Sequence, residues 1–82
     1  MSTAQWNIRF APAATQDRYK IPRGEAALFR DAVAVLYHGL PVDTHPVPGA
    51  LNTYKYARNG YLIAVEVQTE HQTHRVLYFE RE

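Results

Sequence analysis

The sequence predicts an α+β domain in which a helix packs on one face of a four-stranded antiparallel sheet, in the order β-α-(α)-β-β-β. Three apolar, β-rich runs follow one another in the second half of the chain, at residues 51–57, 61–68 and 74–80. A helix-like repeat of apolar residues precedes them, and an alternating segment at residues 6–10 lies near the N-terminus. We therefore expect one domain over residues 1–82, because so short a chain can build only one core.

The first two runs of the second half are predicted to form a hairpin. Asn59-Gly60 stands between them, and this dipeptide is the strongest short-range signal for a two-residue turn. The favoured turn needs a positive φ at both central positions, which Gly adopts freely and Asn at low cost. The alternation along the second run then places four apolar side chains on the face toward the helix: Tyr61, Ile63, Val65 and Val67.

The third run completes a meander of three strands. In this run Leu77 and Phe79 alternate with Val76 and Tyr78, so both faces of the strand carry apolar surface. We expect one face to pack on the helix and the other to keep aromatic surface for a partner.

The first half of the chain supplies one more strand and the helix. Residues 6–10 alternate apolar and polar side chains, and Pro12 ends this strand because it cannot donate to a ladder. Residues 13–19 form either a short helix or an irregular turn. The main helix is predicted from apolar residues that recur every four positions, with Gly39 placed to end it in the left-handed conformation: Leu28, Ala32, Leu36 and Leu40, flanked by Phe29 and Val33. Residues 42–50 read as a loop.

The composition limits the classes of function. Nine basic and eight acidic residues give a net charge of +1, so the chain has no global charge for binding polyanions. It contains no cysteine, which excludes disulfides, thiolate metal sites and a thiol nucleophile. No apolar run approaches the ~20 residues needed to span a bilayer, and no signal-peptide pattern begins the chain. We expect a cytoplasmic protein without a membrane partner.

The pattern resembles the RelE/ParE toxin superfamily of type II toxin–antitoxin systems. The resemblance rests on short motifs that cover most of the chain: the strand and proline at 6–12, the helix end from Leu36 to Pro41, the Pro48-Gly49-Ala50-Leu51 approach to the sheet, the hairpin from Tyr54 to Leu62, and the last strand ending at Arg81. It implies an endoribonuclease toxin that cleaves mRNA, on the ribosome or free, and so inhibits translation. The implied partners are a cognate antitoxin and mRNA or the ribosome.

A candidate RNA-cleaving site follows from the basic residues. Cleavage through the 2′-hydroxyl needs a proton acceptor, a proton donor and cations that stabilise the charged phosphorane. The cationic candidates are Lys55, Arg58, Arg75 and Arg81. The resemblance adds Tyr78 as an acid–base tyrosine. The alternative is that these are solvated strand charges which pair with Glu66 or Glu80 across the sheet, and that the tyrosine only packs.

Two departures from the family pattern keep other functions open. Ala57 and Leu62 stand where the family carries arginines. A non-catalytic module of the same fold, which blocks a topoisomerase or only binds an antitoxin, is the second hypothesis. An unrelated α+β interaction domain is the third. A homodimer is compatible with all three, because a small core gains from burying more apolar surface.

No metal or cofactor is expected. His71 and His74 have a His-x-x-His spacing, but on a strand this spacing places the two rings on opposite faces, and no third ligand is fixed nearby. His74 is a further candidate for an acid or base, since the pKa of histidine lies near neutrality. No glycine-rich phosphate loop occurs in the sequence.

Overall fold

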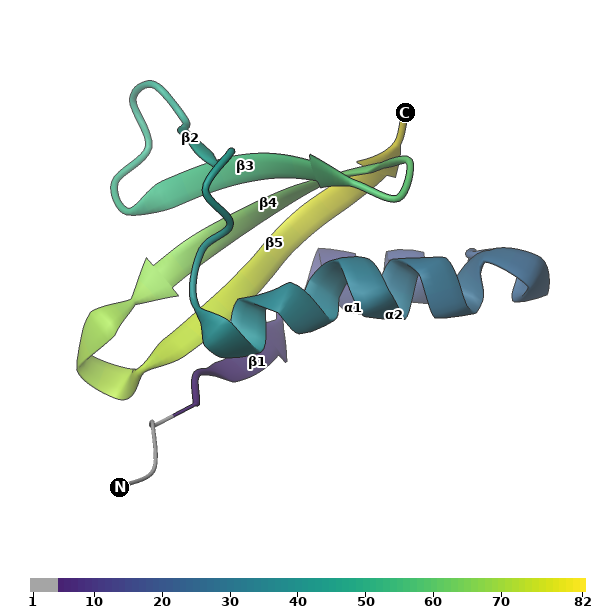
Figure 1. The fold of residues 1–82 in the computed structure, drawn as a ribbon, viewed down its shortest axis with the longest axis horizontal. Coiled ribbons are helices and arrows are strands. Elements are labelled where there is room, and N and C mark those ends of the chain that lie inside the picture. Colours follow the sequence, from purple (N-terminus) through teal and green to yellow (C-terminus); the bar gives the residue numbers. More distant parts are fainter. Residues whose placement is uncertain (1–4) are drawn as a thin grey trace.

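The computed structural model describes residues 5–82, so the first four residues of the expected domain lie outside the described part. The chain forms the following elements in order: β1 (Asn7–Phe10), α1 (Pro12–Arg18), α2 (Ala26–Ala34), β2 (His45–Pro46), β3 (Thr53–Arg58), β4 (Tyr61–Gln68) and β5 (Thr73–Arg81). Single 3-10 turns precede α2 (Arg23–Glu25), extend it (Val35–His38) and join β4 to β5 (Thr69–His71). The predicted α+β class is confirmed (Figure 1).

The sheet differs from the prediction in strand number and in direction. Within the described residues 5–82 it has five strands in the order β1-β5-β4-β3-β2, because the predicted loop at residues 42–50 contains the short strand β2. The β3–β4–β5 meander is antiparallel, but β1 pairs with β5 in parallel. The two helices carry the chain from β1 to the opposite edge of the sheet, and the β3–β4–β5 meander then brings it back beside β1. Such long connections permit parallel pairing. Alternation in residues 6–10 predicted the strand, whereas its direction depends on this route.

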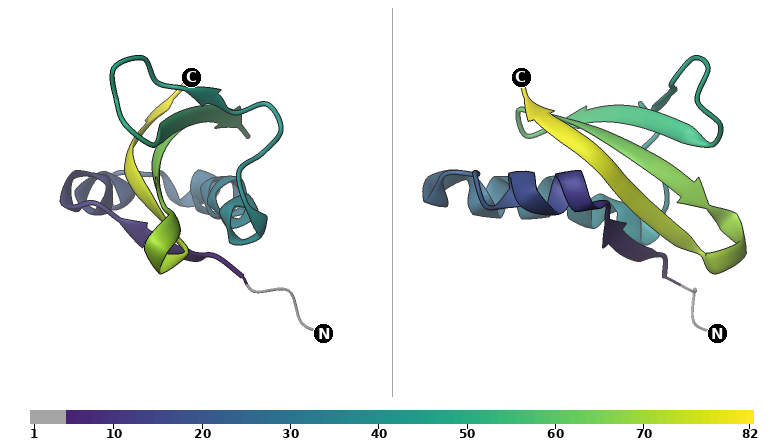
Figure 2. Two further views of the ribbon diagram at one scale, coloured as in Figure 1. Left: turned by 90° about the vertical axis from the view of Figure 1, so that its left-hand side faces the viewer. Right: turned by 180° about the vertical axis from the view of Figure 1, so that it is seen from behind.

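The two helices lie below the sheet and run in opposite directions (Figures 1 and 2). The segment 13–19, left open between helix and turn, forms α1, which packs chiefly against β5. Helix α2 lies against β4. No helix among residues 5–82 is long and apolar enough to cross a membrane.

The buried face of α2 is rotated from the predicted one. Phe29, Ala32, Val33 and Leu36 are buried, whereas the side chain of Leu28 is 46% exposed. These buried positions have the i, i+3, i+4, i+7 spacing of a helix face toward a core, so Leu28 falls on its flank. The four-residue repeat therefore wrongly predicted that Leu28 would be a core residue at the start of the helix.

The predicted turn of the hairpin is confirmed. Asn59 and Gly60 have φ values of 55° and 83°, and Arg58 pairs with Tyr61 across the turn. The next pairs in this register place Tyr56 opposite Ile63, and both side chains are buried toward α2. The Tyr56 hydroxyl donates a 2.8 Å hydrogen bond to a backbone carbonyl of α2, so the hairpin and helix are joined by a polar contact inside the core.

His74 is a buried structural residue and not an acid or base at a site. Its side chain is 1% exposed, it stacks on Trp6 with ring centroids 4.3 Å apart, and its Nδ1 lies 2.8 Å from the Leu36 carbonyl oxygen. Because a carbonyl only accepts, Nδ1 carries the proton and donates. His71 is exposed in the 3-10 turn, so the two histidines do not meet.

We predict that the stability of the fold falls with acidification through His74. Burial lowers the pKa of His74, and the hydrogen bond to Leu36 opposes this shift. The unfolded chain, with a histidine pKa of about 6.5, then binds the proton more tightly than the folded chain. The free energy of unfolding should be constant above about pH 7 and should decrease below it, by at most about 1.4 kcal/mol per pH unit.

Urea denaturation at a series of pH values measures this dependence. In His74→Gln the amide can still donate to the carbonyl, so the variant should be less stable but should lose the dependence between about pH 7 and 5. A wild-type stability that does not change across this range would contradict the assignment.

Candidate functional site

One face of the sheet is turned away from α2 and carries a row of polar side chains, which we call the outward face. Lys55 on β3, Ala64 on β4 and Tyr78 on β5 are direct partners across the three strands. They share the outward face because the positions next to them, Tyr56 and Ile63, point into the core. The hairpin register therefore decides that Lys55 points outward.

An irregularity in β5 adds Arg75 to this face. Ala64 pairs with Tyr78 and the next residue, Val65, pairs with Val76, so the register shifts by one residue at this point. Leu77 is the extra residue on β5, as in a β-bulge. In a regular strand, positions 75 and 78 would point to opposite faces. Here both Arg75 and Tyr78 point outward.

The bulge also corrects the predicted faces of the last strand. Val76 is fully buried, and Phe79 packs against the core with its ring 4.3 Å from that of Phe29. Val76 and Phe79 therefore share the face toward α2. The predicted alternation, with Leu77 and Phe79 on one face, was wrong for this strand.

Lys55 and Tyr78 form a close pair. The Lys55 Nζ atom lies 5.3 Å from the centre of the Tyr78 ring, although β4 separates their strands. The small side chain of Ala64 lies between them and leaves the lysine room to reach across. A hydrogen bond with the Tyr78 side chain, helped by the charge of Glu80, raises the pKa of Lys55 above its usual value. Lys55 is thus a cation and a proton donor at neutral pH.

Arg9 is a member of this face that the sequence reasoning missed. The parallel β1–β5 pair places Arg9 directly beside Arg75, and the side chain of Arg9 is exposed. Arg75 in turn lies next to Glu66, whose Oε1 is 4.0 Å from Arg75 Nη1 and accepts a 3.0 Å hydrogen bond from Gln68. Arg9 could be assigned to this face only by knowing that β1 pairs with β5 in parallel. The sequence pattern does not indicate this pairing.

We call Arg9, Lys55, Arg75 and Tyr78 the outward cluster. Three cations from three strands and one phenol can bind and stabilise a phosphate group. Glu66 and Glu80 lie among them, so the predicted alternative of charges paired across the sheet is realised in part. The arrangement is a mixed site, which contains anion-binding groups and also carboxylates able to accept a proton.

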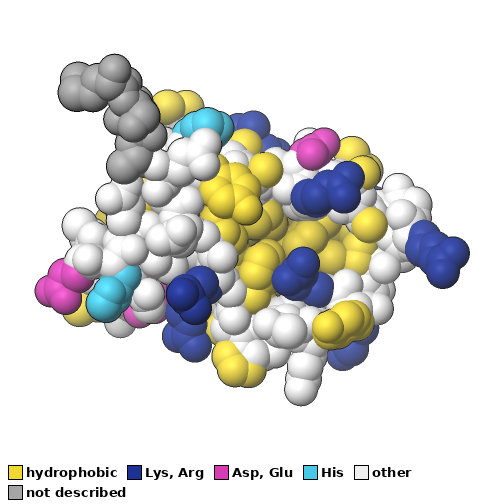
Figure 3. Space-filling view, turned by 90° about the horizontal axis from the view of Figure 1, so that it is seen from below, with side chains coloured by type: hydrophobic (Ala, Val, Ile, Leu, Met, Phe, Trp, Pro, Cys, Tyr) yellow, Lys and Arg dark blue, Asp and Glu magenta, His cyan; other side chains and the backbone are white. Residues whose placement is uncertain are grey.

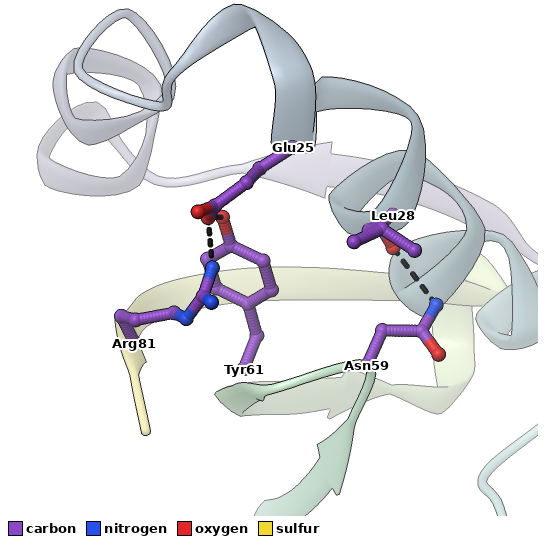
Figure 4. A network of polar contacts seen from close by, with 5 residues as sticks. All are labelled: Glu25, Leu28, Asn59, Tyr61 and Arg81. Atoms are coloured by element: carbon purple, nitrogen blue, oxygen red, sulfur yellow. Dashed lines mark hydrogen bonds and ion pairs between the residues drawn. The ribbon is translucent and has the colours of Figure 1, made fainter.

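Arg81, a predicted site residue, lies on the other face. Its guanidinium contacts the Glu25 carboxylate at the start of α2, and it lies 5.4 Å from the centre of the Tyr61 ring (Figure 4). The Tyr61 hydroxyl donates a 2.6 Å hydrogen bond to the same carboxylate. This bond and the charge of Arg81 lower the pKa of Glu25, and Tyr61 and Glu25 in turn raise the pKa of Arg81. These contacts hold the end of β5 against the start of α2.

Arg58 also lies away from the outward cluster. It occupies the same face as Tyr56, two positions along β3, and it is exposed at the end of the hairpin. The neighbouring Asn59 donates a 3.0 Å hydrogen bond to the Leu28 carbonyl of α2 (Figure 4). The structure therefore brings together three of the five predicted site residues, namely Lys55, Arg75 and Tyr78.

No metal site is built from the residues that the structure describes. Within residues 5–82 no three histidine or acidic side chains lie close enough together to hold an ion.

The fold is that of the RelE toxins. The RelBE2 toxin–antitoxin complex from Mycobacterium tuberculosis matches with a TM-score of 0.82 and 21% identity, over 95% of this chain and 99% of the other. The isolated Escherichia coli RelE toxin matches with a TM-score of 0.77 and 14% identity, over 93% and 83%. The archaeal RelE–RelB complex from Pyrococcus horikoshii matches with 0.71 and 14%, over 93% of each chain. No protein-family model and no curated protein sequence matches the chain.

The contact between Lys55 and Tyr78 makes a direct prediction. In Tyr78→Phe the hydrogen bond that favours the charged lysine is lost, so the pKa of Lys55 should fall toward the ordinary value of about 10.4. Titration of the Lys55 side-chain resonances by NMR measures this change. Tyr54→Phe, on the same strand as Lys55 but on the helix-facing side, is the matched control and should leave that pKa unchanged. An equal effect of the two variants would contradict the pairing.

Proposed function

We propose that this protein is the toxin of a toxin–antitoxin pair and that it cleaves RNA on the outward face of its sheet. The observation that supports this most directly is the convergence of Arg9, Lys55, Arg75 and Tyr78, from three strands, on one accessible face of a RelE-like fold. The antitoxin is proposed as partner because several of the similar structures are toxin–antitoxin complexes.

The proposed reaction is transesterification within the RNA chain. The 2′-oxygen attacks the neighbouring phosphorus and loses its proton, and the bond from phosphorus to the 5′-oxygen of the next nucleotide breaks as that oxygen gains a proton. The products are a 2′,3′-cyclic phosphate and a 5′-hydroxyl end. The reaction therefore needs one proton acceptor, one proton donor and cations around the phosphorane.

The outward face offers a group for each of these needs. Arg75 and Arg9 bind the phosphate oxygens, since guanidinium groups match their geometry. Lys55, held protonated beside Tyr78, stabilises the phosphorane and gives a proton to the leaving oxygen. Glu66, next to Arg75, is the carboxylate that accepts the proton of the 2′-hydroxyl.

Substitution of the two central cations tests the proposal. Lys55→Ala and Arg75→Ala should each lower the rate of RNA cleavage by about a hundredfold, because each removes a charge that acts on the phosphorane. The assay uses purified protein with single-stranded RNA and with mRNA on ribosomes, and it detects the cyclic phosphate product. Lys20→Ala, a cation on the far side of the molecule beside Asp17, is the control and should retain the wild-type rate. Absence of cleavage of both substrates by the wild-type protein would refute the proposal.

Glu66 gives a sharper test, because its catalytic and its merely charge-balancing roles predict opposite results. Glu66→Gln keeps the hydrogen bonding of Gln68 but removes the proton acceptor and one negative charge. If Glu66 accepts the proton, cleavage under saturating RNA should slow by about a hundredfold or more, while RNA binds as tightly as before or more tightly. A variant that cleaves as fast as wild type would show that Glu66 only neutralises Arg75.

A non-catalytic toxin is the second candidate. Ala57 and Leu62, which pair with each other at the hairpin end of the outward face, bring no cation there, and Glu80 lies beside Leu62. A protein of this kind would inhibit growth by binding its target. The Lys55→Ala/Arg75→Ala double variant separates the two, since growth inhibition in cells that express it should persist for a binding toxin and disappear for a nuclease.

A further inference from the structure

A histidine on the edge strand β2 extends the outward face beyond the outward cluster. In the antiparallel β2–β3 pair His45 is the direct partner of Lys55, whereas the next residue, Pro46, is the partner of Tyr54 on the helix-facing side. Because neighbouring positions on a strand point to opposite faces, His45 points outward with Lys55. The row of side chains that joins Tyr78 to Lys55 therefore continues onto a fourth strand.

Hydrogen bonds hold the backbone on both sides of His45. The Val47 N–H donates a 2.8 Å hydrogen bond to the Thr53 carbonyl of β3, and the Thr44 N–H donates a 3.2 Å hydrogen bond to the Pro41 carbonyl. The ring of His45 therefore projects from a backbone with a set position. A group that is already held in place loses little freedom when a ligand binds, so it contributes more to affinity.

The side chain of His45 is available to a ligand. It is exposed, and within residues 5–82 it takes part in no side-chain hydrogen bond and no ion pair. No strand of the described chain lies beyond β2 in the sheet. His74, in contrast, is buried and bonded to the α2 extension. An exposed imidazole at the end of a row of phosphate-binding groups is a surface on which a nucleobase can stack.

The distance along the row decides between two roles for His45. Neighbouring strands lie about 4.8 Å apart, so β2 is about 10 Å from β4. The Lys55 ammonium reaches over Ala64 of β4 toward Tyr78, which is the direction away from His45. A phosphate held by that ammonium is too far from the imidazole for direct proton transfer, which needs a separation of about 3 Å. The sugar and base of the neighbouring nucleotide span such a gap.

We propose that His45 stacks on the base of the nucleotide next to the scissile phosphate, so that β2 forms a nucleotide subsite of the outward face. The inference rests on the proposed RNA-cleaving function and adds to it a residue that positions the substrate. In this arrangement the RNA strand crosses the sheet from β5 toward β2. Stacking accepts every base, and purines, which have the larger rings, should bind more tightly than pyrimidines.

The helix side of the molecule supplies matched controls. Figure 3 shows that side, with basic side chains around a hydrophobic hollow. Arg30 of α2 lines the hollow, and His38 is exposed in the 3-10 turn that extends α2. Neither residue belongs to the outward face. Their replacement therefore measures the effect of losing a cation or an exposed histidine elsewhere on the surface.

Binding of RNA that cannot be cleaved tests the stacking. The probe is a fluorescent single-stranded 2′-O-methyl RNA, and the measurement is anisotropy at low salt. His45→Ala should weaken binding by about tenfold, whereas His45→Phe, which keeps an aromatic ring, should bind within about twofold of wild type. His38→Ala and Arg30→Ala should bind as wild type does. Undiminished binding by His45→Ala, or no binding of the probe by the wild-type chain, would overturn the proposal.

Removal of single bases from the probe locates the subsite. At one position an abasic nucleotide should weaken binding to the wild-type chain by about tenfold and should have no further effect on His45→Ala, because both changes remove the same contact. That position should lie next to the phosphate at which the chain cleaves unmodified RNA. Additive effects of the two changes at every position would refute the contact.

Cleavage kinetics separate stacking from proton transfer. If His45 only holds the base, His45→Ala should raise KM by about tenfold and should leave kcat within about twofold of wild type. A loss of kcat that His45→Phe does not restore would assign proton transfer to His45 and overturn the proposal.

The subsite and the proposed function can fail separately. A chain that binds the probe with the expected dependence on His45, but cleaves no RNA, would refute only the nuclease. A chain that cleaves RNA with the same KM in wild type and His45→Ala would refute only the subsite.

Discussion

The two-residue turn at Asn59-Gly60 is the constraint on which the rest of this structure depends. It pairs Arg58 with Tyr61 and thereby sets the faces of β3 and β4 for their whole length. A shift by one residue would turn Tyr56 and Ile63 out of the core and Lys55 into it. The hydrogen bond from Tyr56 to the α2 backbone, and that from Asn59 to the Leu28 carbonyl, fix the same register from the side of the helix.

The fold places side chains of the same types in different surroundings on the two faces that this register defines. Toward the helices, Tyr61 and Arg81 contact Glu25, and these contacts join the ends of β4 and β5 to the start of α2. Away from the helices, Lys55 and Arg75 lie half-buried on the outward face. The same residue types therefore tie the sheet to the helices on one face and form the outward cluster on the other, and only the face on which each residue lies distinguishes the two arrangements.

The bulge at Leu77 lets β5 contribute two side chains to each face of the sheet around this point. On its inner side Val76 and Phe79 both reach the core, although three positions separate them. On its outer side Arg75 and Tyr78 both reach the outward face. A regular strand would offer only one member of each pair to its face. Bulges are commonly found where a strand has to redirect a side chain toward a site, and here one extra residue serves the core and the cluster together.

Local patterns in the sequence determined the elements of this protein. The alternation in residues 6–10 and the Asn-Gly turn act through neighbours in the chain, so they predicted the first strand and the hairpin without knowledge of the fold. The apolar helix repeat likewise predicted the helix that becomes α2, and with the meander it indicated the α+β class. The outward direction of Lys55 follows from the turn in the same local way.

The tertiary structure alone decided which residues meet. The parallel pairing of β1 with β5, which brings Arg9 beside Arg75, depends on the two helices that carry the chain to the far edge of the sheet and on the meander that brings it back. The bulge depends on how β5 fits both the core and β4, so the faces of Arg75, Tyr78 and Arg81 could not be read from a period of two. These are contacts between segments far apart in the sequence. Their geometry is set by packing and closure, which no local pattern encodes.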